Sequence, residues 1–173
     1  MNIFIDTVRR LSVLCGIVSV VLLMASVVVV CHLVIVRYAL GESAVWQHEF
    51  VTFALIGSTF LGSPYVLLTK GHVNVDLLPI YMGQRGRLVL ALLSSLLSLG
   101  FCLVIAWTGL SWWEEAWAGD WHGETVWAPP LWIPYIAMPL GMALLSLQYV
   151  ADIASILTGR EMPFGLSPEE KSS

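Results

Sequence analysis

The residues that decide the fold run from Arg37 to Pro79 and read RYALGESAVWQHEFVTFALIGSTFLGSPYVLLTKGHVNVDLLP. The middle of this stretch is apolar and about as long as the roughly 20 residues that a helix needs to cross a membrane. Its flanks differ in chemistry. Trp46 and Glu49, three positions apart, share one face of the first helical turns, whereas the segment from Lys70 to Leu77 alternates polar and apolar residues. An apolar helix with such unlike ends has a fixed direction in a bilayer.

Composition places the whole chain in a membrane. Of the 173 residues, 58% are hydrophobic and only 12% are charged, and the mean hydropathy is +0.83, whereas soluble domains carry about 25% charged residues. Short connections separate four apolar runs, so a single domain over residues 1–173 is expected. The predicted class is an all-α integral membrane protein with four transmembrane helices, at about 11–36, 44–68, 88–113 and 129–157. The tail at 158–173 is predicted to be partly disordered.

Charge and motif content exclude several classes. The net charge of −4 leaves no basic face that could collect nucleic-acid phosphates. Three cysteines, Cys15, Cys31 and Cys102, lie within apolar runs and are interpreted as small buried hydrophobes. The first apolar run exceeds the roughly 7–15 residues of a signal-peptide core, which predicts a retained first helix. No nucleophile with a positioned base and no phosphate loop occurs, so an enzyme is not expected.

Basic residues predict the orientation. Four spans place both termini on one side, together with the link between the second and third helices. That side carries Arg9, Arg10, Lys70, Arg85, Arg87, Arg160 and Lys171, and the other side carries only Arg37. Because cytoplasmic segments are rich in lysine and arginine, both termini are predicted to be cytoplasmic. The link from Thr69 to about Gly86 is predicted to lie at the cytoplasmic interface.

Small residues recur along the second and third helices. They are Gly57, Ser58, Gly62 and Ser63 on the second, and Ser94, Ser95, Ser98 and Gly100 on the third. Small side chains at helical spacing let another helix approach closely in a membrane. We therefore expect these faces to contact a protein partner rather than lipid.

A dense cluster of tryptophans and acids follows the third helix. Six of the eight tryptophans lie between Trp107 and Trp127, as in an aromatic belt at a membrane–water boundary. The acids of this segment, which have no basic neighbour in it, are Glu114, Glu115, Asp120 and Glu124. Two interpretations stay open: a solvated acidic link above an aromatic belt, or a docking surface for a soluble partner.

Glu49 is the acid of greatest interest, because an ionisable group within a membrane span is a candidate functional residue. The dipole at the start of its helix can stabilise the carboxylate. An ion pair with Arg37 across the short first link is the expected structural role, and direct handling of an ion or proton is the functional alternative.

Four histidines raise the alternative of a haem-bearing membrane electron-transfer subunit. Such a site needs two histidines at matching depth on facing helices. His32 and His48 could lie at the same depth in the membrane. His72, in contrast, is predicted on the opposite side, and His122 in a link. An absorbance spectrum of the purified protein would test this alternative. The preferred interpretation has no bound cofactor and no metal.

Three motifs resemble the small membrane subunit, of the DctQ type, of tripartite ATP-independent periplasmic (TRAP) transporters. The first is Leu40-Gly41 followed by Trp46 and Glu49, after Arg37. The second runs from Gly62 to Asp76 and contains GHVNVD, and the third is WIPYIAMPLG, ending at Gly141. Their order and spacing extend the resemblance over Leu11 to Leu157. Lys70 departs from the arginine expected there, which keeps the charge but not the bidentate fork.

The resemblance implies a three-part system in the bacterial inner membrane. A periplasmic binding protein captures an organic acid, and a large membrane subunit carries it inward, driven by a sodium gradient. This chain would pack beside the large subunit and enlarge its scaffold, while substrate and sodium bind to the large subunit. Expected partners are those two proteins and membrane lipids, with no nucleic acid.

The resemblance and the residue patterns together give two sets of candidates. Structural or interface candidates are Arg37, Trp46, Glu49, Gly62, Lys70, His72 and Asp76. Docking candidates for the binding protein are Glu114, Glu115, Asp120 and Glu124. A stand-alone channel or exporter is a third class of function, which uptake by this chain alone would reveal.

Overall fold

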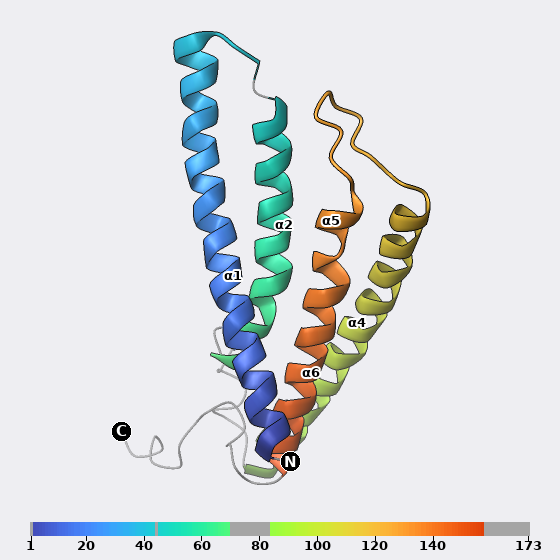
Figure 1. The fold of residues 1–173 in the computed structure, drawn as a ribbon. Helices are drawn as coiled ribbons and strands as arrows, with labels where there is room; N and C mark the ends of the chain where they lie inside the picture. The colour runs from blue at the N-terminus through green and yellow to red at the C-terminus, as the bar shows by residue number, and fades with distance from the viewer. Residues whose placement is uncertain (1, 44, 70–83, 158–173) are drawn as a thin grey trace, which may run out of the picture.

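The computed structural model describes residues 2–43, 45–69 and 84–157. Its elements, labelled as in Figure 1, are α1 (Asn2–Ile35), the π-helical turn η1 (Val36–Leu40), α2 (Val45–Leu68), α4 (Gln84–Ala118), α5 (Trp132–Tyr135) and α6 (Ala137–Leu157). Within these described ranges, four helical stretches are long and apolar enough to cross a membrane. The predicted all-α class with four transmembrane helices is confirmed. The predicted interfacial segment and tail lie outside the described residues.

The first span is longer than predicted, because helix α1 already begins at Asn2. Its 34 residues rise about 51 Å, against roughly 30 Å of hydrocarbon, so part of the helix projects beyond the membrane core. The helix continues through η1 and ends at Gly41, whose φ of 66° lies in the left-handed region. The Gly41 amide bonds to the Val36 carbonyl, which makes Gly41 the C-terminal cap that its sequence position predicts.

The third span, α4, runs past its predicted end at 113 to Ala118. Neither glycine nor proline interrupts the sequence WWEEAWA, so nothing in it stops the helix. The turn comes at Gly119, whose amide donates to the Glu115 carbonyl at 2.8 Å. Glu114 and Glu115 therefore lie on a helix and not in the link where the sequence placed them.

The fourth span is not one helix from 129 but a short helix, α5, followed by α6, with Ile136 between them. Prolines explain both changes. Pro129 and Pro130 belong to the preceding link, where Pro130 pairs with His122 in an isolated antiparallel bridge. Pro134 and Pro139 have no amide hydrogen and cannot complete the hydrogen bonds of a continuous helix.

Helix α6 lies at the centre of the packing. It contacts α1, α2 and α4, while α1 packs mainly on α2, and α4 packs mainly on α6 (Figure 1). The start of α1 and the end of α6 lie at the same end of the molecule. We call the opposite end, which carries the link residues 41–43 and the link at 119–131, the link end.

The small residues of α2 pack against α1 within this chain. Ser19 donates to the Ser58 carbonyl at 2.7 Å, and Ser58 donates to the Ser19 carbonyl at 3.1 Å. A Cβ on Gly62 would lie 2.7 Å from the Ser19 hydroxyl, so only glycine permits this approach. For α2, the prediction that this face meets another protein is wrong, because the pattern that admits a partner helix also admits α1.

Candidate functional site

The link at 119–131 forms an ordered hairpin at the link end. Within it Gly123 donates to the Pro129 carbonyl at 3.0 Å, and Leu131 donates to the Trp121 carbonyl at 2.9 Å. Val126, near its tip, is 98% exposed. Backbone pairing across the link therefore presents its polar residues on a defined surface.

Tryptophans attach this hairpin to the bundle. The Trp113 indole nitrogen donates to the Trp132 carbonyl at 3.1 Å. The ring of Trp117 meets that of Trp132 edge to face at 4.7 Å between centroids, and it lies 5.9 Å from that of Trp113. Aromatic pairs in this geometry add about 0.5–1.5 kcal/mol beyond the area that they bury. These contacts hold α5, which directly follows the hairpin, against α4.

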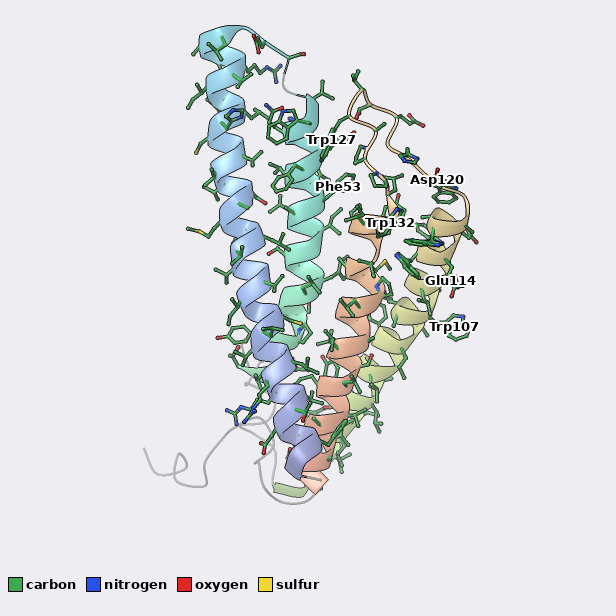
Figure 2. All side chains as sticks on the ribbon, in the orientation of Figure 1. Phe53, Trp107, Glu114, Asp120, Trp127 and Trp132 are labelled. Atoms are coloured by element: carbon green, nitrogen blue, oxygen red, sulfur yellow. The ribbon has the colours of Figure 1, made fainter. Side chains whose placement is uncertain are left out.

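The four docking candidates are all exposed, but they lie on two different elements. Glu114 and Glu115 lie on α4, and Figure 2 shows Glu114 and Trp107 on the side of α4 away from α6. Asp120 and Glu124 lie on the hairpin. His122 lies beside Asp120: its Nδ1 is 3.9 Å from the carboxylate and 2.7 Å from the Asp120 carbonyl oxygen.

Trp46 and Glu49 both face the hairpin. The Trp46 ring lies between those of His32, at 5.9 Å, and Trp127, at 6.5 Å. Glu49 Oε1 lies 3.5 Å from the point where a Cβ on Gly123 would stand. The shared face that the sequence predicts for Trp46 and Glu49 is thus the contact of α2 with the second link.

Three side-chain atoms near the start of α2 and in the hairpin are buried without a hydrogen-bond partner. They are Gln47 Oε1, Glu49 Oε2 and Thr125 Oγ1. A buried polar atom without a partner costs about 1–3 kcal/mol, so each of these atoms marks a place where a further group would be stabilising.

Arg37 does not pair with Glu49. Among the described residues, no nitrogen of Arg37 lies within 4.0 Å of a Glu49 oxygen. Instead, Arg37 lines an open hollow of about 250 Å³ with Leu33, Glu42, Ser43, Val45 and His48. Glu49 does not line this hollow, and its Oε1 lies instead beside Gly123 of the hairpin. The expected ion pair is wrong for this geometric reason.

Of the remaining candidates, one makes a structural contact and three lie outside the described residues. Gly62 forms the close contact with α1 given above. Lys70, His72 and Asp76 lie outside the described residues. Of the two histidines proposed for haem, His32 packs on Trp46 and His48 lines the Arg37 hollow.

Sequence reasoning missed an apolar groove between α2 and the α5–α6 segment. Its volume is about 380 Å³, and α2 contributes Phe50, Phe53 and Gly57 to its wall. The prolines of the hairpin and of α5 form the opposite wall. Their spacing was visible in the sequence, but it indicated a bent helix and not a groove.

Comparisons with known proteins give one family and two relatives. The family model described as "Tripartite ATP-independent periplasmic transporters, DctQ component" matches residues 26–159. A C4-dicarboxylate TRAP transporter small permease protein from Vibrio cholerae is 27% identical, with 73% of this chain and 64% of the relative covered. A protein of the same description from Pseudomonas aeruginosa is 23% identical, with 75% of this chain and 63% of the relative covered. The chain thus spans under two thirds of either relative. No solved structure matches.

Proposed function

Because this chain belongs to the DctQ component family of tripartite ATP-independent periplasmic transporters, we propose that it works as the small permease subunit of such a transporter. The observation that supports this proposal is the match over residues 26–159, which covers most of the residues in the four membrane-spanning helices. The chain is a multi-pass protein of the bacterial inner membrane. The haem-bearing alternative is not favoured by these comparisons.

The proposed role is to support a large membrane subunit during the import of an organic acid coupled to sodium entry. C4-dicarboxylates are the first substrates to test, since the names of both relatives include them. Large apolar side chains exposed on α4, among them Leu97, Phe101 and Trp107, offer a surface for a membrane partner. We place the binding of substrate and sodium on that partner.

We propose that the link end faces the periplasm. The excess of basic residues on the opposite side of the chain supports this orientation. It places the hairpin at 119–131 and the end of α4 where a periplasmic binding protein arrives.

The acids of this surface are proposed to help receive the binding protein. The contact has to be transient, because the binding protein must leave after delivery. Exposed charges suit this need, since they speed the encounter while each adds little affinity. Screening acts over about 8 Å at physiological ionic strength, so added salt should weaken the contact.

A reconstituted uptake assay tests both roles. Proteoliposomes hold this chain with or without the large subunit, and labelled substrate is offered with purified binding protein and a sodium gradient. This chain alone should give no uptake above background. Uptake by this chain alone would overturn the accessory role.

The docking role is tested by neutralising Glu114, Glu115, Asp120 and Glu124 together. The matched control exchanges each Glu for Asp and the Asp for Glu, which keeps all four charges. Neutralisation should slow uptake mainly at limiting binding protein, and added salt should slow the parent in the same way. If the neutralised variant equals the charge-conserving control at every binding-protein and salt concentration, the acids have no docking role.

A further inference from the structure

The groove between α2 and the α5–α6 segment is apolar throughout. Fourteen residues line it, and none carries a charge, a hydroxyl or an amide side chain. A water molecule needs two to four polar partners to occupy such a space. An empty space of this size would instead forfeit the dispersion contacts of the whole lining. The groove therefore suits an apolar occupant.

The length of the groove corresponds to one leaflet of a bilayer. Along α2 its lining extends from Phe50 to Leu61, and the eleven steps between these residues rise about 16 Å, or half of the roughly 30 Å hydrocarbon layer. Near its deep end, Gly141 of α6 packs directly on the backbone of Phe60. The helices separate from this contact toward the link end, where Trp127 and Pro129 line the groove.

Polar atoms without partners lie at the link end of this groove. Glu49 directly precedes Phe50, and its Oε1 lies 3.5 Å from the position of a Cβ on Gly123, with Pro129 Cδ at 2.9 Å from the same point. The second oxygen, Oε2, is buried without a hydrogen-bond partner, as is Thr125 Oγ1. Glu49 does not line the groove, but it lies beside Pro129, which does, so an apolar groove of leaflet length has a carboxylate next to its link end.

We propose that this groove is a lipid site, which holds one acyl chain of a phospholipid whose ammonium headgroup meets the Glu49 carboxylate. A primary ammonium carries three donors and forms strong, charge-assisted hydrogen bonds with carboxylates. Phosphatidylglycerol lacks such a cation, so its headgroup offers only a phosphate charge that Glu49 repels. The occupant is therefore an aminophospholipid such as phosphatidylethanolamine, in the leaflet on the link-end side. This proposal does not depend on the transport role.

The test uses the full chain in nanodiscs of equal parts phosphatidylethanolamine and phosphatidylglycerol. Each lipid in turn carries a trace of an analogue with a photoreactive diazirine in the middle of one chain. After irradiation, mass spectrometry of peptides locates the adducts. We expect the ethanolamine probe to label residues 50–61 and 127–140 above the exposed faces of α1 and α4.

Two bulky substitutions block the groove from exposed positions. Leu140→Trp, on α6, and Ile133→Trp, on α5, start from side chains that are 48% and 53% exposed, so neither forces a residue into the core. Each should lower groove labelling about tenfold, as expected when an indole displaces about two methylene groups. Leu147→Trp, two turns further along α6 and outside the groove, is the matched control and should leave labelling unchanged.

Glu49→Gln tests the headgroup assignment. It should equalise labelling by the ethanolamine and glycerol probes while adducts stay in the groove. Three results would each overturn the proposal: adducts spread evenly over all exposed helix faces, equal labelling in Leu140→Trp and Leu147→Trp, or no preference for the ethanolamine probe in the parent chain. Loss of groove labelling when the large subunit is co-expressed would assign the groove to a partner helix instead.

Discussion

Replacing Gly141 with alanine should weaken the central contact of the bundle. A Cβ at this position would stand 2.6 Å from the carbonyl carbon of Phe60, whereas ordinary contacts begin at 3.4 Å. The Phe60 carbonyl oxygen lies closer still. Because the obstacle is helix backbone, no side-chain rotation relieves it, and α2 and α6 must separate locally by about 1 Å. A gap of that size forfeits a quarter to a half of each dispersion contact across the interface.

The expected magnitude follows from two opposing terms. Overpacking lowers the free energy of unfolding by about 1–3 kcal/mol. Replacing glycine by alanine within a helix raises it by up to about 1 kcal/mol. Gly100→Ala, in α4, is the matched control, because a Cβ there meets nothing within 4 Å and only the second term applies. The difference between the two variants should therefore be about 1–3 kcal/mol.

Unfolding of the purified chain by sodium dodecyl sulfate in mixed micelles, followed by tryptophan fluorescence, measures this difference. Gly141→Ala should unfold at a lower detergent fraction than the parent, and Gly100→Ala at the same or a higher fraction. Equal midpoints for the two variants would refute the close approach of α6 to the Phe60 backbone.

Three further predictions follow from individual contacts. Ser58→Ala removes the hydrogen bond from the Ser58 hydroxyl to the Ser19 carbonyl and should cost about 0.6–2 kcal/mol in the same titration. Ser63→Ala, whose hydroxyl bonds only to Thr59 of its own helix, should cost less, and equal losses would contradict the contact between α1 and α2. Trp113→Phe removes the hydrogen bond to the Trp132 carbonyl, which is worth about 0.5–1.5 kcal/mol, so the amides at 121–131 should exchange hydrogen faster than in the parent. The control is Trp107→Phe, whose parent ring is 74% exposed. If both variants exchange at the same rate, this bond does not hold the link. In a cysteine-free background, an impermeant maleimide should label Val126→Cys in intact spheroplasts and Asp6→Cys only after permeabilisation; the opposite result would reverse the proposed orientation.

The membrane spans could be predicted from the sequence, because each hydrophobic run is long and its interruptions are polar. Helix ends were less predictable. Glu114 and Glu115 were assigned to a link because they are charged, yet both residues are compatible with a helix, and the chain turns only at Gly119. Pro129 and Pro130 resemble a helix start, but here they pair in the hairpin, and that pairing depends on His122 and Gly123, six or more positions away.

The site was predictable in its residue types but not in its pairings. Trp46 and Glu49 were correctly placed on one face of α2. Local sequence could not indicate that Glu49 would face Gly123, because this contact joins the start of α2 to a link that follows α4. The small residues of α2 illustrate the same limit: their spacing predicts a close helix contact, and Ser19 rather than another protein provides it.

The central position of α6 also bears on how the protein is made. Of the four spans, α6 leaves the ribosome last, yet α4 finds its main packing partner only there. Helices α1 and α2 can form their hydrogen-bonded contact as soon as both are inserted, since Ser19 and Ser58 belong to these two helices alone. A nascent chain arrested between Ala118 and Ala137 would thus contain one assembled helix pair, α1–α2, and one helix without its main packing partner, α4. In that state α4 would depend on the insertion machinery or on a chaperone, and membrane proteases would find it exposed. Once α6 has been synthesised and inserted, α4 can pack against it and is no longer exposed.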